Sequence, residues 1–488
     1  MSKIAIVGGG VAGLSAGIIC AEDGHDVTVY EKHRIAGGNL TGWSRRGYTI
    51  DNCVHWLTGT NPVSDTYKMW EKLGVIDEKE IYRSSALYTY TVEGKSIFLH
   101  RDINRLEEEM LKLAPEDEGE IRDLIRVTRV MMRILGIGGE SKCESIGPGG
   151  LVRSLPLLIK YNGLSVGELS KKFKSPLISG FVRAFIGECF ASLALIFVYA
   201  HYCGDNADLP KGGSPAFASR FIERLTLLGG KLRLGCEVEK IRHGGGHASS
   251  LVLVGGEEIE ADYFIVTSDT RTTFDKLLSI PMPKPLKKSY DSQGMKRFSS
   301  YQAAFAVELS ELPFKGDYMF ELSFKYQNLL GAKNLILREF SHEPSFAPDG
   351  CNIIQTMTFL TEEECLKFIQ KREDSPEQYK AMKERLSERL KEAIEGHFPA
   401  LSGKLSLLDI WTPATYKRYT GADIGSYMSF VLPKKTLPIR VSPKIDGLDN
   451  VYLATQWQMA PGGLPIAAEF GMNAAEQIKK AESKKRKY

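Results

Sequence analysis

The chain lacks the features that mark several classes of protein. Its formal net charge is only +3 over 488 residues, so a surface adapted to bind nucleic acids is not expected. The eight cysteines include no C-x-x-C pair, which favours reduced thiols and a cytoplasmic location. The most apolar stretch, Leu193 to Ala200, is too short to span a bilayer. We expect no metal site, and no signal peptide because the first strand begins at Lys3.

Nucleotide-binding fingerprints are also scarce. Only the stretch from Gly8 to Gly13 has the G-x-G-x-x-G spacing between an expected strand, residues 3–7, and an expected helix. Gly8 permits a tight turn there, Gly10 lets the backbone approach a pyrophosphate, and Gly13 lets the helix pack closely on the strand. Because no second fingerprint follows in such a setting, the sequence indicates no NAD(P)H site.

The residues after this turn extend the prediction. The N-terminus of the helix, where Val11 and Ala12 lie, offers N–H donors and a positive dipole end to phosphates. A second strand over residues 27–30 ends at Glu31, where an acid is expected to bind a ribose 2′-hydroxyl, and Lys32 follows it. A carboxylate at this point would repel a 2′-phosphate, so the bound dinucleotide should carry none.

The chain then folds back through a glycine doublet instead of continuing the strand–helix alternation. Gly37, Gly38 and Asn39 are followed by a polar stretch from Asp51 to His55. With these motifs the sequence resembles the two-dinucleotide-binding-domain flavoproteins, especially the branch of phytoene desaturases, carotenoid isomerases and retinol saturases. The resemblance implies that the doublet lies near the pyrophosphate and ribityl chain of FAD and that the Asp51 stretch lies beside the flavin.

The C-terminal segment carries the second half of this resemblance. A strand of buried type over residues 450–454 precedes a loop and a helix that opens at Gly462, Gly463 and Leu464. In the family, backbone amides at this helix N-terminus face the flavin pyrimidine, where they stabilise the anionic charge of the reduced flavin. Val238 lies in the segment where the family's backbone contacts adenine, and it is a further expected cofactor contact.

The resemblance also implies the fold. We expect an α/β protein in which a Rossmann-like, glutathione-reductase-like FAD-binding domain is interleaved with an α+β substrate domain. The FAD-binding domain is predicted to be discontinuous and to comprise residues 1–63, 206–280 and 439–488. The substrate domain is predicted to comprise residues 64–205 and 281–438.

Periodicity predicts several elements of the substrate domain. Residues 64–205 have a mainly helical pattern, including two helices between Asn104 and Leu135 that are divided near Pro115. A later helix is expected to begin at Ser375, with that serine as its cap and Gln378 completing a capping box.

The resemblance implies an FAD-dependent oxidoreductase. It would transfer hydride between flavin N5 and an apolar polyene, terpenoid or lipid-like substrate, giving desaturation, saturation or isomerisation. Trp56, Tyr427 and Trp457 are candidate cavity residues, and His55 is a candidate proton donor or acceptor. The sequence does not identify the electron partner, which is the substrate, oxygen, a quinone or another protein.

Two other functions remain open at this point. A flavin amine oxidase shares the fold and the terminal motifs, and prenyl-protein escort factors use the same fold without flavin. The relation to membranes is also open, because residues 151–200 combine apolar segments with Lys160, Lys171 and Lys172. This pattern fits either peripheral contact with a membrane or a buried helical lid with a solvated lysine face.

Overall fold

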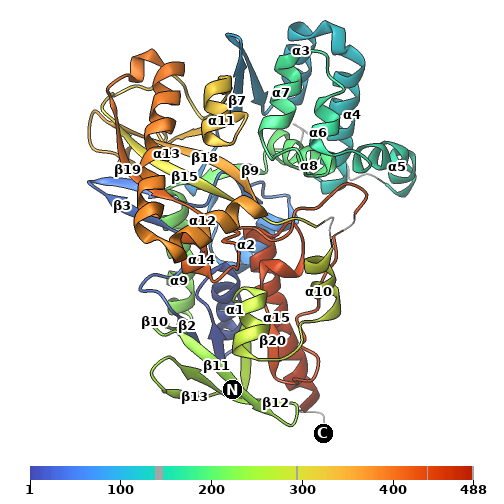
Figure 1. The fold of residues 1–488 in the computed structure, drawn as a ribbon. Coiled ribbons are helices and arrows are strands. Elements are labelled where there is room, and N and C mark those ends of the chain that lie inside the picture. Colours follow the sequence, from blue (N-terminus) through green and yellow to red (C-terminus); the bar gives the residue numbers. More distant parts are fainter. Residues whose placement is uncertain (138–146, 293–294, 437, 486–488) are drawn as a thin grey trace.

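The computed structural model describes residues 1–137, 147–292, 295–436 and 438–485. Within these residues, a five-stranded parallel sheet forms the lower part of the molecule in Figure 1. Its strands, in spatial order, are β10 (Lys231–Leu234), β2 (Asp26–Glu31), β1 (Lys3–Val7), β14 (Tyr263–Val266) and β20 (Val451–Leu453). All five lie inside the three segments that we propose as the nucleotide-binding domain.

Both faces of this sheet are covered, as the nearly continuous burial of β1, β14 and β20 requires. Ile4 and Ile6 of β1 pack on the side of three helices, while Ala5 and Val7 pack on the side of a small antiparallel sheet. The helices are α1 (Val11–Glu22), α9 (Gly213–Leu227) and α15 (Leu464–Lys485). The antiparallel strands are β11 (Val238–Gly244), β12 (His247–Leu253) and β13 (Glu258–Glu260).

The two glycine-rich ends of the chain meet where α1 and α15 cross. Gly471 of α15 lies so close to α1 that a Cβ added to it would be 2.2 Å from the carbonyl oxygen of Ala12. The close packing brings the N-termini of both helices to the same side of the parallel sheet (Figure 1).

A seven-stranded mixed sheet forms the second part of the molecule. Its order is β19 (Leu405–Trp411), β15 (Phe298–Val307), β18 (Asn352–Thr361), β17 (Asn334–Glu339), β16 (Asp317–Glu321), β7 (Ala86–Val92) and β8 (Lys95–His100). Neighbouring strands are antiparallel except for β16 and β7. Helices α11 (Phe324–Leu330), α12 (Glu362–Asp374), α13 (Pro376–His397) and α14 (Pro413–Thr420) accompany it.

A helical group lies beside this sheet at the upper right of Figure 1. It comprises α3 (Ile103–Leu113), α4 (Glu118–Leu135), α5 (Pro148–Asn162), α6 (Val166–Ser170), α7 (Pro176–Ala184) and α8 (Ser192–Cys203). The other α-helices and strands of the described residues are α2 (Asp65–Leu73), α10 (Lys284–Asp291), β3 (Gly42–Arg45), β4 (Tyr48–Asp51), β5 (Leu57–Thr58), β6 (Ile81–Tyr82) and β9 (Ala207–Pro210). Among the described residues, no helix is long and apolar enough to cross a membrane.

The structure confirms some local predictions and corrects others. The two helices divided at Pro115 are present as α3 and α4. The mainly helical pattern assigned to residues 64–205 missed strands β7 and β8, which form one edge of the large sheet through the pairing of β7 with β16. Pro376 begins α13 as predicted, but the expected serine cap is absent. Ser375 also ends α12, where its N–H bonds to Lys371, and the side chain of Gln378 accepts a hydrogen bond from Lys371 instead of closing a capping box.

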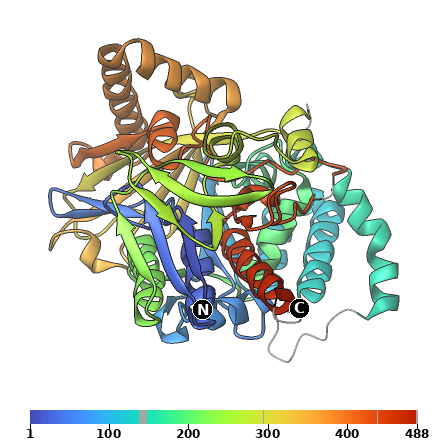
Figure 2. The ribbon, with the colours of Figure 1, turned by 90° about the horizontal axis from the view of Figure 1, so that it is seen from below.

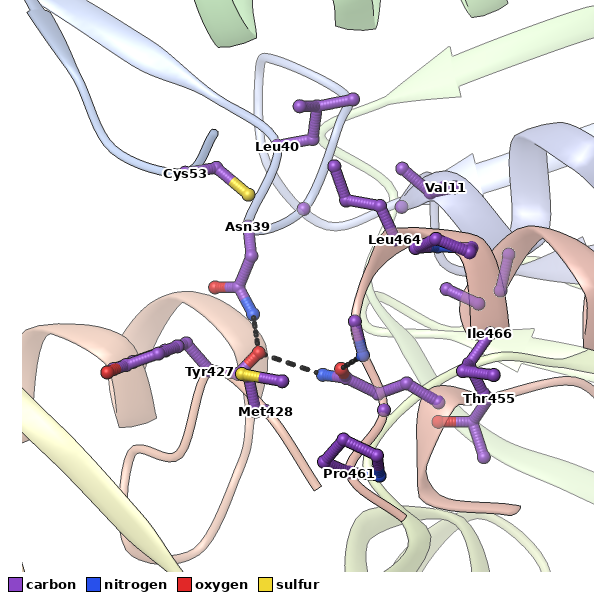
Figure 3. A pocket seen from close by; sticks show the side chains of 18 of the residues that line it. Val11, Asn39, Leu40, Cys53, Tyr427, Met428, Thr455, Pro461, Leu464 and Ile466 are labelled. Atoms are coloured by element: carbon purple, nitrogen blue, oxygen red, sulfur yellow. Dashed lines mark hydrogen bonds between the residues drawn. The ribbon is translucent and has the colours of Figure 1, made fainter. Parts of the chain in front are cut away.

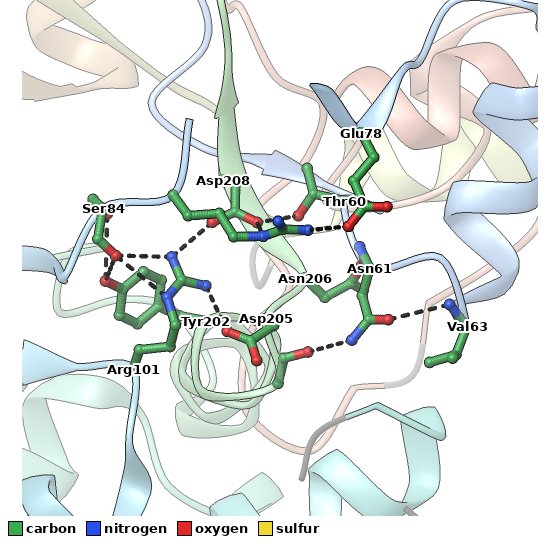
Figure 4. A network of polar contacts seen from close by, with 12 residues as sticks. Thr60, Asn61, Val63, Glu78, Ser84, Arg101, Tyr202, Asp205, Asn206 and Asp208 are labelled. Atoms are coloured by element: carbon green, nitrogen blue, oxygen red, sulfur yellow. Dashed lines mark hydrogen bonds and ion pairs between the residues drawn. The ribbon is translucent and has the colours of Figure 1, made fainter. Parts of the chain in front are cut away.

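A buried polar network ties the loop after β5 to β9 (Figure 4). Asp208 of β9 is fully buried, and its carboxylate accepts hydrogen bonds of 2.6 Å from both Arg101 and Thr60. The neighbouring Asn206 accepts from the N–H of Asn61 at 2.9 Å. Because a buried carboxylate needs such partners, the network fixes the place where the chain passes from the helical group back to the parallel sheet.

Candidate functional site

One large cavity joins the two parts of the molecule. Its volume is about 1250 Å³, and it is lined both by the turns around the parallel sheet and by residues of the large sheet and helical group. Cavities for a single small ligand usually have about 300–1,000 Å³. This cavity therefore has room for a cofactor and a second molecule.

The turn between β1 and α1 forms one end of the cavity. Gly8 has a φ of +102°, and a Cβ at Gly13 would lie 2.0 Å from the carbonyl oxygen of Gly8, so both positions require glycine. Gly10 differs, because the nearest atom to an added Cβ would be 3.8 Å away. Gly10 also starts α1 without a side-chain cap, which leaves the first N–H groups of the helix, near Val11 and Ala12, bare toward a ligand.

Glu31 lies beside this turn and is held by the main chain. Its carboxylate accepts hydrogen bonds from the N–H groups of Gly9 at 2.7 Å and His33 at 2.9 Å. Lys32 and Val238 line the cavity next to it. Burial lowers the pKa of Lys32, whose ammonium donates to the carbonyl of Arg418. The arrangement leaves an acid and main-chain groups at the point where the sequence predicts ribose and adenine contacts.

The glycine doublet packs directly on the first turn. Gly37 donates a hydrogen bond of 2.7 Å to the carbonyl of Gly9, and a Cβ at Gly38 would lie 3.1 Å from the Cα of Gly10. Both residues of the doublet have positive φ values, 119° and 63°. A side chain at Gly38 would press on the first turn, and one at Gly37 would lie 2.2 Å from the carbonyl oxygen of Leu40, so both positions favour glycine.

The start of α15 completes this end of the cavity (Figure 3). Gly462 and Gly463 have positive φ values, and the N–H of Gly463 donates to the Gln456 side chain at 2.9 Å. The other end of that side chain donates to the carbonyl of Tyr427 at 3.0 Å. Asn39 donates to the same carbonyl at 3.3 Å. The N-terminal and C-terminal glycine segments are thus joined around one oxygen, with Leu464 opening the helix beside them.

The opposite end of the cavity is apolar. Trp56 lines it and packs on Phe185 with ring centroids 5.1 Å apart. The ring of Tyr427 borders the same space. Other lining residues come from α4, α8, the segment before α8 and the large sheet: Met131, Leu135, Ile186, Phe190, Leu193, Phe197, Val198, Phe298, Met319, Ile336, Met357 and Phe359. Such a surface favours an apolar ligand.

Trp457 has a different environment. It borders the cavity, but its ring is buried against Tyr290 and Phe430, with centroid distances of 5.9 Å and 5.2 Å. It shares a hydrophobic cluster with Val7 and Val238 of the parallel-sheet side. Trp457 therefore lies closer to the glycine turns than to the apolar end.

His55 stands between the two ends of the cavity. Its Nδ1 is 3.9 Å from a carboxylate oxygen of Asp317, and its Nε2 is buried without a hydrogen-bond partner among the described residues. Burial, and then the nearby Arg338 cation, lower the pKa of His55, while Asp317 acts in the opposite direction. The imidazole is therefore neutral near pH 7.

The loop that carries His55 is held from both sides. The carboxylate of Asp51 accepts hydrogen bonds from the N–H and the hydroxyl of Ser214, each at 2.6 Å. The same hydroxyl accepts from the N–H of Val54 at 2.8 Å, and Arg338 donates to the Val54 carbonyl at 2.6 Å. The sequence prediction did not include Ser214, Asp317 or Arg338, because nothing in the local sequence connects them with His55. No group of potential metal ligands was found in the described parts of the chain.

The comparisons with known proteins agree with this geometry. The model of the flavin containing amine oxidoreductases matches residues 11–309. The chain belongs to this family. The predicted cofactor, FAD, and the expectation that the protein is an enzyme are thereby confirmed, and the bare glycine turns and the large cavity fit that cofactor.

Curated relatives point to one branch of the family. Prolycopene isomerase of Daucus carota is 25% identical over 446 residues, which cover 86% of this chain and 71% of the relative. The 4,4'-diaponeurosporene oxygenase of Staphylococcus haemolyticus is 22% identical and aligns over 99% of this chain and 98% of its own. These matches confirm the predicted resemblance to carotenoid-modifying flavoenzymes and give less support to the amine oxidase and escort alternatives.

Solved structures confirm the predicted fold. An oxidoreductase from Methanosarcina mazei has a TM-score of 0.62 at 18% identity, covering 97% of this chain and 100% of that one. A triple mutant of putrescine oxidase has a TM-score of 0.59 at 14% identity, covering 98% and 99%. At these identities the likeness concerns the fold alone, a Rossmann-like FAD-binding architecture.

Proposed function

We propose that this protein is an FAD-dependent oxidoreductase that acts on an apolar, polyene-like substrate. One observation carries the proposal: the glycine turns and a long apolar chamber belong to a single cavity of about 1250 Å³. A dinucleotide at the turns leaves the apolar chamber for a second molecule. The names of the relatives, a prolycopene isomerase and a diaponeurosporene oxygenase, support a conjugated hydrocarbon as the class of substrate.

The chain's own groups divide the work of holding FAD. In our proposal the first turns of α1 and the glycine doublet bind the pyrophosphate through main-chain N–H groups, while Glu31 and Val238 lie at the ribose and adenine. The N-terminus of α15, at Gly463 and Leu464, lies beside the pyrimidine ring. The bound flavin would supply two-electron chemistry, and the protein would position the substrate and exclude water.

The cavity argues against small amines as substrates. An amine substrate is cationic at neutral pH and requires compensating charge or an aromatic cage. At the apolar end, the carboxylate of Asp317 already has a cationic neighbour, since its oxygen lies 3.7 Å from Nε of Arg338. The other side chains at that end are apolar, so they offer a cation no ionic partner, and only the faces of their aromatic rings could attract it.

The absorbance spectrum of the purified protein tests the proposal. A flavin spectrum, with FAD identified by mass after heat release, is expected. Anaerobic addition of a conjugated hydrocarbon with saturated segments, such as a phytoene-type polyene, should then bleach the flavin or change the absorbance of the polyene. A colourless protein that does not bind added FAD would contradict the proposal, and bleaching by putrescine but not by polyenes would favour the amine oxidase alternative.

We also propose that the protein works at the cytoplasmic surface of a membrane, through α5. This helix projects from the helical group (Figures 1 and 2) and exposes Leu151, Val152, Leu155 and Ile159, of which Val152 is 69% and Ile159 64% accessible. Helix α5 packs on α8, whose Phe197 is exposed and also lines the cavity. An apolar helix face beside the cavity suits a bilayer that delivers an apolar substrate.

Flotation with lipid vesicles tests this contact. The wild type should float with vesicles, whereas V152E and I159E should stay in solution. L227E is the matched control, because Leu227 is 79% exposed but lies on α9, away from the helical group. Failure of the wild type to float, or equal flotation of all variants, would contradict a role for α5.

A further inference from the structure

The strand register explains why a charged pair lies beside the apolar cavity. Tyr318 of β16 pairs with Leu337 of β17, so the preceding residue, Asp317, lies next to Arg338 across the ladder. Arg338 is only 3% exposed, and its Nε is 3.7 Å from the Asp317 carboxylate. A guanidinium buried to this degree requires a nearby anion, and Asp317 supplies it.

Arg338 connects this pair to the loop of His55. It donates a hydrogen bond of 2.6 Å to the carbonyl of Val54, which is the residue before His55. Its guanidinium also lies over the ring of Phe340, 4.9 Å from the centroid. The loop before His55 is therefore bonded to a buried arginine, whose Nε and Nη1 have no hydrogen-bond partner among the described residues and rely on the ion pair with Asp317.

Two carboxylates lie near His55. That of Asp51 is already engaged in hydrogen bonds, whereas that of Asp317 faces the imidazole. Asp51 accepts three hydrogen bonds, from Ser214 and from the N–H of Cys53. Asp317 lines the cavity, is 16% exposed at its side chain, and lies 3.9 Å from Nδ1 of the imidazole. These two acids and Arg338 are the charged groups that act on His55.

We infer that Asp317, paired with Arg338, is a positioning residue that keeps the proton of His55 on Nδ1, so that Nε2 of this cavity-lining ring carries the free lone pair and can act as a base. A carboxylate beside one ring nitrogen favours the proton on that nitrogen, and the imidazolium formed later is stabilised by the same charge. Nε2 has no hydrogen-bond partner among the described residues and almost no accessible surface, so the cavity-lining ring has to shift before this nitrogen meets a substrate proton.

The inference deepens the proposed function and rests on it for the substrate. Desaturation removes a hydride and a proton from neighbouring carbons, and a bound flavin would supply the hydride acceptor. When the proton is removed, a C–H bond of the substrate breaks and its electron pair becomes the π bond of the new double bond. The proton forms an N–H bond at Nε2 of His55 and leaves an imidazolium opposite Asp317.

The tautomer and titration of His55 test the inference without any turnover. The protein is purified with its cofactor, labelled with ¹⁵N-histidine, and the His55 signals are assigned by their loss in H55Q. We expect a neutral, Nδ1-protonated ring. D317N should lower the pKa of His55 further, and R338M should raise it, because the two charges act in opposite directions. D409N is the matched control, since Asp409 lies on β19 of the same sheet and pairs with Arg45.

Turnover of a polyene provides the second readout. H55Q should reduce kcat by about 100-fold or more. D317N should reduce kcat with little change in KM and move the acid limb of the pH profile to lower pH, and D317E should restore part of the rate. A ring protonated on Nε2, or a His55 pKa that D317N leaves unchanged, would overturn the inference. A protein without FAD would contradict the proposed function, while the titration would still decide the inference about Asp317.

Discussion

The two ends of the cavity are built from different parts of the polypeptide. The glycine end consists of main chain held in conformations that a side chain would disrupt, as at Gly8, Gly37 and Gly463. The apolar end consists of side chains from helices and strands that are far apart in the sequence. A main-chain site leaves no room for adjustment, whereas a site made of many apolar side chains can lose one and repack. Substitutions that clash with main chain at the first end should therefore act in an all-or-none manner, and those at the second should act gradually.

Gly13→Val should have the largest effect. Even the first carbon of the new side chain would lie 2.0 Å from the carbonyl oxygen of Gly8, and main chain cannot move aside as a side chain can. We expect a loss of about 3 kcal/mol or more in the free energy of unfolding, together with loss of FAD. Urea unfolding measures the first effect, and a variant as stable as wild type would show that the two elements tolerate separation.

Gly10→Ala separates ligand binding from folding at the same turn. The nearest protein atom to the new methyl group is 3.8 Å away, so the stability of the free protein should change little. FAD affinity should fall about 10- to 100-fold, since the methyl group keeps a phosphate from N–H groups whose charged hydrogen bonds contribute about 1.5–3 kcal/mol each. Flavin fluorescence titration measures the affinity. Unchanged FAD binding would place the pyrophosphate elsewhere.

This difference between the ends also decides what the sequence can predict. Glycines at Gly8–Gly13 and Gly462–Gly463 act through their own main chain, so their role is readable from a short stretch. Arg338 acts on a loop 284 residues earlier in the chain, and only the register of β16 and β17 brings Asp317 beside it. The strand β7 was missed although β8 follows it directly as its hairpin partner, because the helices that come later in residues 64–205 dominate the pattern of that segment; its other partner, β16, lies far away in the sequence.

Ser214→Ala tests the connection between the ends. The hydroxyl donates to buried Asp51 and accepts from Val54, so its removal leaves a carboxylate oxygen and an N–H without this partner. The expected loss is about 1–3 kcal/mol in the free energy of unfolding, with a further loss in turnover because the His55 loop is released. Ser299→Ala is the control, since that buried hydroxyl donates only to the Gly425 carbonyl among the described residues. Equal effects of the two variants would contradict a special role for Ser214.

Asp269 lets the glycine end be probed by pH. Burial, and then Asp423, raise the pKa of this carboxyl to about 7, compared with about 3.9 in an unfolded chain. The folded protein binds the proton more tightly, so this group's contribution to stability is complete below about pH 4 and is lost as the pH rises toward 7. Relative to D269N, the wild type should lose on the order of 1–3 kcal/mol across this range. Parallel stability curves for the two proteins would contradict the raised pKa.

Trp56→Ala should have the smallest effect and defines the apolar end. The ring packs on Phe185 at 5.1 Å and borders a space already large enough for a second molecule, so its removal enlarges the chamber without breaking a hydrogen bond. We expect a loss of about 1 kcal/mol in polyene affinity, or roughly fivefold, with unchanged FAD content. Trp43→Ala is the matched control, because Trp43 packs on Trp411 and donates to Asp409 outside the cavity lining. Loss of FAD binding in Trp56→Ala would contradict this expectation. The two ends would then not be separable, and the apolar chamber would have to be regarded as part of the cofactor site.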